Sequence, residues 1–131
     1  MISVDFDLES PAATRERLSK GYRGRRNFLV YTLLSMLVEQ TPVKTGLARG
    51  NWQIGVKVRP VGTIDRLDPD GDLGPLEELG KLRGASPFSD IFIGNNLDYI
   101  DELENGSSGQ APEGIMRVVL PAFRAMNGDA L

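Results

Sequence analysis

Apolar and polar side chains alternate at two places in the chain, and this pattern predicts strands because successive side chains of a strand point to opposite faces. Over residues 2–9 the apolar side chains are Ile2, Val4, Phe6 and Leu8, and the others are Ser3, Asp5, Asp7 and Glu9. Over residues 51–59 the apolar side chains are Trp52, Ile54, Val56 and Val58. Residues 90–94 form a third, mainly apolar segment, so we expect three short strands.

Residues 11–40 have the spacing of a long helix. Ser10 and Pro11 are typical of an N-cap and a first helical position. Pro42 predicts the helix end, because proline disfavours helical geometry in the residue before it.

Two glycines, Gly21 and Gly24, lie in the middle of this helix. Each costs roughly 1 kcal/mol relative to alanine, so we expect a bend or a break there. Basic side chains cluster at the same point, namely Lys20, Arg23, Arg25 and Arg26. We interpret this basic cluster as a candidate contact between subunits, with arginines that face a lumen or solvent as the alternatives.

Residues 28–38 are apolar at every position except Thr32 and Ser35. A helix that is apolar on most of its circumference is buried on most sides. The sheet of a small domain covers one side, and either a neighbouring subunit or the later helices of the same chain cover the rest. The subunit-contact candidates here are Phe28, Tyr31, Leu34 and Val38.

The rest of the chain contains loops and shorter helices. We expect loops over residues 60–75 and 105–110, and helical segments over residues 76–83, 97–103 and 112–126. Pro and Gly are frequent in the first loop, and we expect both loops to become ordered only on assembly.

The composition excludes several kinds of chemistry. The 131 residues include neither cysteine nor histidine, which rules out disulfides, a Ser-His-Asp triad and a zinc site built on these ligands. We expect no metal and no cofactor. The longest apolar run is also far below the ~20 residues that span a bilayer, and the N-terminus has no basic leader, so we expect the host cytoplasm and no membrane contact.

Charge is distributed unevenly along the chain. Residues 1–60 carry a net charge of +5 and residues 61–131 a net charge of −8, within a total of −3. Two solvated faces of opposite sign explain this, as does a basic surface that meets the acidic surface of an identical neighbour. A free nucleic-acid-binding module is disfavoured by the overall acidity.

Two groups of acidic residues are candidate chemical sites. Asp68, Asp70 and Asp72 have the spacing of the first calcium ligands of an EF-hand loop, but leucine stands at its glycine and glutamate positions, so we do not expect calcium. Asp98, Asp101 and Glu102 share a helical face, and paired acids perform glycoside hydrolysis. A carboxylate-dependent hydrolase is therefore a remote alternative.

Three segments together resemble the tail-component family of long-tailed bacteriophages, whose members are also called tail-completion or neck proteins. The motif residues of this resemblance are Pro42, Thr45, Gly46, Leu47, Arg49, Asn51, Trp52, Asn95, Asn96, Tyr99, Glu104, Gly106, Gln110, Ala111, Pro112 and Gly114. They follow the family order across about residues 10–125. Lys44, Ala48 and Ile100 depart from the pattern.

The resemblance implies a single α+β domain over residues 1–131. One long N-terminal helix would pack on a small, mainly antiparallel sheet of three to four strands, with short C-terminal helices. It further implies a non-enzymatic virion protein that forms a six-fold ring at the head–tail joint. Its partners would be copies of itself, the head connector and the tail-terminator or tail-tube proteins, with DNA passing through the lumen without sequence-specific binding. The alternative role is a tail-terminator ring that caps the tail tube.

Overall fold

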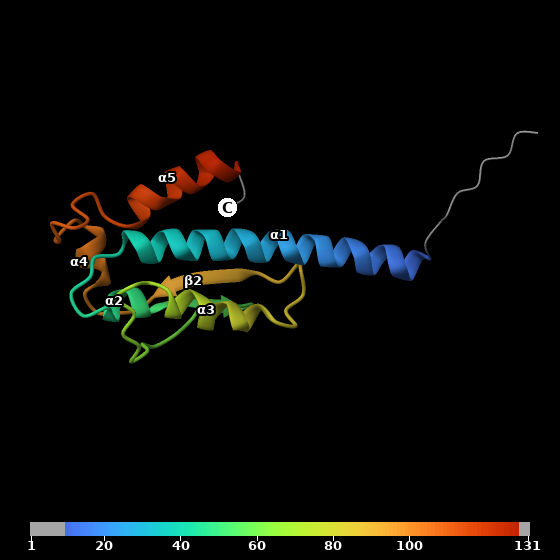
Figure 1. Cartoon of the computed structure of the whole chain (residues 1–131), viewed down its shortest axis with the longest axis horizontal. Helices are drawn as coiled ribbons and strands as arrows, with labels where there is room; N and C mark the ends of the chain where they lie inside the picture. Colours follow the sequence, from blue (N-terminus) through green and yellow to red (C-terminus); the bar gives the residue numbers. More distant parts are fainter. Residues whose placement is uncertain (1–9, 129–131) are drawn as a thin grey trace, which may run out of the picture.

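The computed structural model describes residues 10–128, and the strand expected over residues 2–9 lies outside the described residues. The elements in chain order are α1 (Pro11–Gln40), α2 (Leu47–Gly50), β1 (Trp52–Val56), α3 (Leu73–Leu79), the 3-10 helix η1 (Gly80–Leu82), β2 (Ile91–Asn95), α4 (Ile100–Glu104) and α5 (Met116–Asn127). The architecture is α+β, as predicted, with one long helix, a small antiparallel sheet and short helices (Figure 1).

Helix α1 has the predicted bounds. The Ser10 side chain accepts a hydrogen bond from the Ala13 N–H at 3.1 Å, and Thr41 leaves helical geometry directly before Pro42. Of the bend or break expected at Gly21 and Gly24, the break is wrong, because α1 continues through both as one helix of 30 residues (Figure 1). Glycine lowers the stability of a helix but keeps its backbone N–H and C=O groups. The helical hydrogen bonds therefore continue through both positions.

The sheet is smaller than expected. Within residues 10–128 it has two strands, with Trp52 opposite Asn95 and Val56 opposite Ile91. The strand predicted over residues 51–59 ends early because Lys57 adopts a left-handed φ of 68°. The Glu78 and Lys81 side chains, described below, occupy the other edge of β1.

The final helix begins later than expected, at Met116 instead of Pro112. The Glu104 carboxylate, at the end of α4, accepts hydrogen bonds from the N–H groups of Ile115, Met116 and Arg117. Because these groups have no partner inside the helix, a carboxylate that receives all three sets the position of the first turn.

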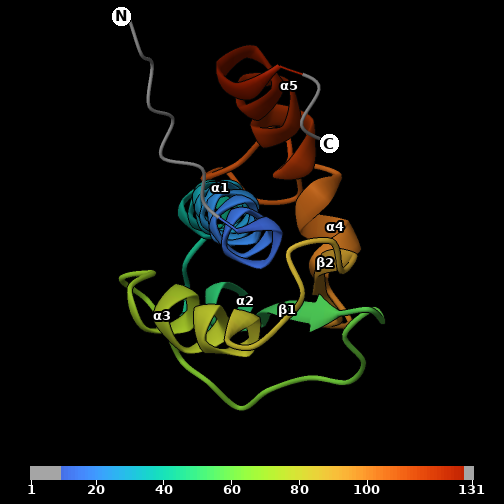
Figure 2. The same ribbon diagram turned by 90° about the vertical axis from the view of Figure 1, so that its right-hand side faces the viewer.

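The hydrophobic core surrounds the C-terminal half of α1. Helix α5 packs on one side of it, and the sheet lies with α3 on the other (Figure 2). The buried cluster consists of Leu33, Leu34, Leu37, Val38, Trp52, Ile54, Leu82, Ile115, Val119 and Phe123. The N-terminal half of α1 extends beyond the end of this body (Figure 1).

Candidate functional site

The subunit-contact candidates on α1 divide into buried and exposed residues. Leu34 and Val38 are buried in the core of the single chain, so they are not available to a neighbouring subunit. The later elements of the same chain cover this part of α1, which was one of the two arrangements that the sequence left open. Phe28 and Tyr31 are exposed, at 62% and 40% of their surface.

The exposed apolar surface of α1 lies on its projecting half, residues 11–31. Leu18 and Tyr22 are exposed there in addition to Phe28 and Tyr31. At about 100° per residue, Leu18 and Tyr22 share one side of the helix, and Phe28 and Tyr31 share another. The projecting half therefore has two exposed apolar sides, and on one of them the Tyr22 ring lies against the Phe88 ring, with 5.7 Å between the ring centroids.

The basic cluster has both internal and exposed members. The Arg23 Nε donates to the Ala85 carbonyl at 3.3 Å, and an Arg26 Nη donates to the Ser86 carbonyl. Burial, followed by repulsion from the Arg23 guanidinium, lowers the pKa of Arg26. These two arginines fasten α1 to the turn before β2.

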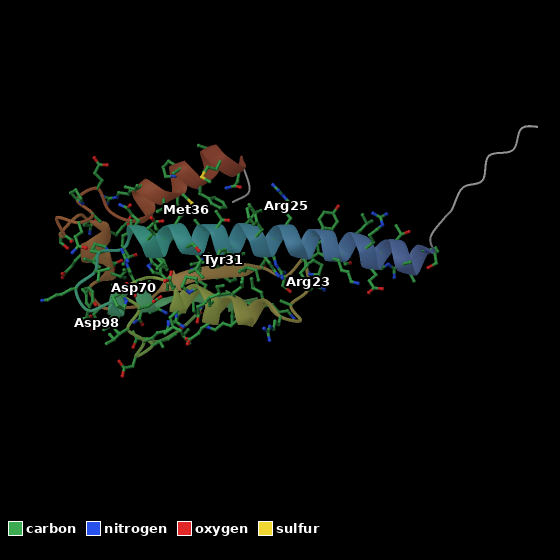
Figure 3. The ribbon with its side chains drawn as sticks, in the orientation of Figure 1. Arg23, Arg25, Tyr31, Met36, Asp70 and Asp98 are labelled. Carbon is green, nitrogen blue, oxygen red and sulfur yellow. The ribbon has the colours of Figure 1, made fainter. Side chains whose placement is uncertain are left out.

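Lys20 and Arg25 are the exposed members of the cluster. Lys20 forms an exposed ion pair with Glu16 at 3.2 Å, and Arg25 points away from the sheet (Figure 3). Only this pair of the four predicted basic residues is free of bonds to the body in the described structure.

Arg49 is the central motif residue of the loop after α1. Its guanidinium donates to the carbonyl oxygens of Thr41 at 2.9 Å, Glu39 at 3.1 Å and Pro69 at 2.8 Å. One side chain thereby satisfies carbonyl groups at the end of α1 and joins them to the loop of residues 60–72. Its role in the described structure is to hold backbone segments together.

Gly46 closes the same loop. It has a φ of 90°, and a Cβ atom there would lie 2.5 Å from the Pro69 nitrogen, so no other residue fits without strain. Its carbonyl accepts from the N–H groups of Gly50 and Asp68. Nearby, Thr45 Oγ1 accepts from the Leu47 N–H at 3.3 Å, and the adjoining motif residue Pro42 is buried.

Asn51 and Trp52 serve the interior. The buried Asn51 amide donates to the carbonyls of Leu47 and Ile64 and accepts the Ile64 N–H, each at 2.7 or 2.8 Å. The Trp52 indole N–H donates to the Thr41 hydroxyl at 2.8 Å. The Asn51 amide therefore satisfies both backbone groups of Ile64 and holds this loop next to α2 and β1.

Asn95 and Asn96 hold the far end of β2. The Asn95 amide donates to the Ala48 carbonyl at 2.9 Å, and the Asn96 amide donates to the carbonyls of Pro60 and Gly62. These two neighbours therefore connect β2 to the loops on both sides of β1.

The remaining motif residues shape the segment between α4 and α5. Gly106 and Gly114 have φ values of 85° and 92°, and a Cβ atom on Gly114 would lie 2.4 Å from the Glu104 carbonyl oxygen. Ala111 is fully buried, and Pro112 packs against Gly106 in an exposed turn.

Gln110 and Tyr99 complete the motif set. The Gln110 side chain donates to the Val43 carbonyl and accepts the Val43 N–H, both at 2.9 Å, in the manner of a strand pair. Tyr99 is the exception, because it is 39% exposed and makes no bond that ties one segment to another. Most of the motif residues thus act as internal ties.

A buried ionic network lies where the sequence predicted a loop without fixed structure. Arg66 donates to the carbonyls of Gly50 and Trp52, and pairs with Glu77 at 3.0 Å and with Glu78 at 3.1 Å. Both partners of the Arg66–Glu78 pair are almost fully buried. These contacts hold part of residues 60–75 against β1 and α3, and the expectation that the loop becomes ordered only on assembly stays a prediction.

Glu78 is the centre of this network. It accepts from the Ile54 N–H at 2.8 Å and from the Lys81 ammonium at 2.7 Å. Burial alone raises its pKa, but the hydrogen bonds from Lys81, Ile54 and Arg66 outweigh that effect and hold the pKa below its ordinary value. Sequence analysis missed Arg66 and Glu78, because single charges in a loop and on a short helix give no periodic signal.

The predicted acidic groups also have structural surroundings. Asp68 accepts from the N–H groups of Asp72, Leu73 and Gly74, and so caps the start of α3. Across residues 10–128, His, Cys, Asp and Glu side chains form no group of three or more that fits a metal ion. Asp70 is exposed and lines an open cavity between α1 and the start of α3.

The carboxylates of the remote hydrolase alternative are all exposed. Asp98 lies at the end of the molecule where α1 terminates (Figure 3), and Asp101 and Glu102 lie on α4. Asp101 lines a shallow cavity together with Glu104, whereas Asp98 and Glu102 do not. The three carboxylates therefore do not converge on one enclosed space.

A groove runs along β2 between the sheet and the two helices α1 and α5. It has a volume of about 590 Å³ and continues into a second cavity of about 300 Å³. The two share Trp52, Phe92, Ile93 and Met116 in their walls. We refer to both together as the β2 groove.

Comparisons with family models, curated proteins and solved structures returned no match for this chain. The resemblance to phage tail-completion proteins therefore rests on the motif residues. Among the described residues, no helix combines the length and the apolar character needed to cross a bilayer.

Proposed function

We propose that this protein is a non-enzymatic structural component of a long-tailed bacteriophage virion, and that its copies form a ring at the joint between head and tail. The observation that carries the proposal is that one group of residues holds the fold together and a separate group remains exposed. Motif residues hold the loops to one another inside a single body, while a long helix leaves large apolar side chains uncovered. Exposed apolar surface of this kind is typical of protein–protein contact.

A second group of exposed apolar side chains lies outside α1. Its side chains come from the segment after β1 and the start of α3, namely Val58, Val61, Leu67, Leu73 and Leu76. Two different surfaces on one chain favour head-to-tail contacts between copies, and such contacts close into rings when the rotation allows.

The charge distribution supports the same arrangement. The N-terminal 60 residues have a net charge of +5, and the later residues a net charge of −8. Opposite charges on the two contacting surfaces steer the copies into a head-to-tail orientation and disfavour contacts between like surfaces. We propose six copies on the resemblance alone, with head-connector and tail-terminator or tail-tube proteins as neighbours.

The test is inactivation of the gene in the phage or prophage genome that carries it, followed by negative-stain imaging of the particles. Filled heads separated from finished tails are the expected result. Overlong tails would assign the alternative role of a tail terminator, and normal infectious virions would overturn both roles. Expression of the intact chain in trans is the control, and it must restore joined particles.

The purified chain provides an independent test of the ring. Mass photometry over a range of concentrations should detect closed oligomers, and imaging should show a central opening. A chain that remains monomeric at every concentration, alone and with its neighbouring virion proteins, would contradict ring formation.

A further inference from the structure

The two edges of the small sheet differ. On the outer edge of β1, Glu78 accepts the Ile54 N–H at 2.8 Å and Lys81 donates to the Ile54 carbonyl at 3.3 Å. Arg66 donates to the next outward carbonyl, that of Trp52. Side chains thus take the place of a third strand, and this edge is closed.

The outer edge of β2 is open. Ile93 lies opposite Ile54 in the ladder. The backbone N–H and C=O groups of Ile54 point away from β2, so those of Ile93 point away from β1, toward the outer edge of β2. Within residues 10–128, no backbone or side-chain group forms a hydrogen bond with the outward groups of Ile93. Such an edge pairs readily with another strand.

The β2 groove provides an apolar wall beside this open edge. Leu29 and Leu33 of α1 and Met116 and Leu120 of α5 line it next to β2. The Arg59 guanidinium, in the wall of the smaller cavity, lies 5.7 Å from the centre of the Phe92 ring and provides a positive charge at this edge. A strand that is apolar on one face and acidic on the other matches both surroundings.

Residues 2–9 have this pattern, with Ile2, Val4, Phe6 and Leu8 alternating with Ser3, Asp5, Asp7 and Glu9. The apolar set fits the apolar wall formed by α1 and α5, and the acidic set fits the Arg59 guanidinium. The outer edge of β1 is not available to this segment, because side chains occupy it.

The geometry of α1 indicates which copy supplies the strand. Ser10 caps the start of α1, while Arg26, some 16 residues later, bonds to the turn before β2. This stretch of helix is about 24 Å long at ~1.5 Å per residue. Returning over that distance takes about seven extended residues at ~3.3 Å each, which leaves too few of residues 1–9 to pair with β2.

We propose that residues 2–8 of a neighbouring copy add to the open edge of β2 as a third strand, with their apolar side chains in the β2 groove. Each copy then donates one strand and receives one. This inference rests on the self-association proposed above, but not on the location of the protein in a virion.

The decisive experiment separates donor from receiver. A variant that lacks residues 2–9 receives a strand but donates none. Ile91→Pro donates but does not receive, since it removes an outward N–H at the first residue of an edge strand, where proline is tolerated. By mass photometry each variant alone should be monomeric, and their mixture should contain pairs and no larger species, whereas the intact chain forms larger oligomers.

A matched pair of substitutions tests the predicted orientation of the strand. Phe6→Asp places a charge in the groove and should weaken assembly at least tenfold, because it removes a large apolar contact. Asp5→Asn alters the opposite face and should change assembly less than threefold. Equal effects of the two substitutions would contradict the orientation.

Hydrogen exchange of the intact chain gives a measurement that does not depend on the folding of any variant. The Ile93 amide should exchange slowly in the oligomer and rapidly in the monomer of the variant that lacks residues 2–9. Adding a peptide of residues 1–9 to that monomer should restore the protection, while a scrambled peptide should not.

Two results would overturn the inference. If the variant without residues 2–9 assembles like the intact chain, the segment has no role, and the proposed ring still stands. If a monomer of the intact chain already protects Ile93, the strand comes from the same chain. Failure of the proposed function differs from both, because it gives normal virions without the gene or no self-association of the intact chain.

Discussion

The body of the molecule and the projecting half of α1 differ in which side chains they bury and which they expose. In the body, polar side chains are buried and matched, and the described residues contain no buried side-chain polar atom without a hydrogen-bond partner. In residues 11–31 of α1, four large apolar side chains are exposed, although Leu29 and Val30 pack against the core. The motif residues mainly hold the segments of one chain together, whereas we propose that residues outside the motifs form the contacts between proteins.

The largest expected difference between the two regions concerns a buried and an exposed arginine. Arg66→Met should destabilise the protein by about 3–5 kcal/mol, because it removes one of the two cations paired with the buried Glu78 carboxylate and leaves the Gly50 and Trp52 carbonyls without their donor. Arg25→Met, on the projecting helix, should change stability by less than about 0.5 kcal/mol. Urea unfolding followed by circular dichroism measures both, and equal losses would show that the body and the helix do not differ as described.

Glycine substitutions should have opposite signs in the two regions. Gly114→Ala in the body should cost about 1–3 kcal/mol, since the φ of 92° is strained for alanine and its Cβ atom would meet the Glu104 carbonyl. Gly21→Ala and Gly24→Ala should each stabilise α1 by up to about 1 kcal/mol, because a Cβ atom there has open space. Thermal unfolding of the three variants is the measurement. A loss of stability at Gly21 or Gly24 would reveal a contact on the projecting helix.

Acid should act on the body through Glu78. A carboxylate whose pKa is lowered in the folded state stabilises that state above its unfolded pKa, near 4.5, and the contribution is lost as the pH falls through the lower folded value. The stability difference between the wild-type chain and Glu78→Gln should therefore be largest above about pH 5 and should shrink in acid. Glu77→Gln is the control, since the Glu77 side chain is 52% exposed. A difference that stays constant with pH would remove Glu78 from the ionic network.

The smallest effect on stability is expected on the projecting helix itself. Phe28→Ser should change the free energy of unfolding by less than about 0.5 kcal/mol, because the ring is largely exposed. It should nevertheless weaken self-association, as sedimentation velocity can measure. Phe123→Ala is the counterpart in the core and should cost about 3–5 kcal/mol. Unchanged association of Phe28→Ser would limit the contact surface to other residues.

Local signals explain what the sequence predicted well. The bounds of α1 follow from Ser10 and Pro42, which act on their immediate neighbours, and the predicted α+β architecture is confirmed. The alternation in residues 51–59 located β1, although its end at Val56 depends on the left-handed φ of Lys57, which alternation does not encode.

Contacts between distant segments explain what the sequence missed. Glu104 sets the start of α5 from another helix, and Arg66 holds an apparently unstructured loop through Glu78 and two carbonyl groups. From the sequence alone, neither residue can be distinguished from a charged residue at the surface. The motif residues were found as a pattern, but their role as ties became evident only from their partners. The proposed ring and its location in a virion remain predictions.

The closed edge of β1 has a consequence for growth. A sheet with two open edges extends in both directions and without limit, which is the geometry of fibrous aggregates. Because Glu78, Lys81 and Arg66 occupy one edge, each molecule accepts at most one incoming strand, at β2. A valency of one acceptor per molecule permits chains and circles but no branches, so the ionic network inside each body also limits the architecture of whatever is built from it.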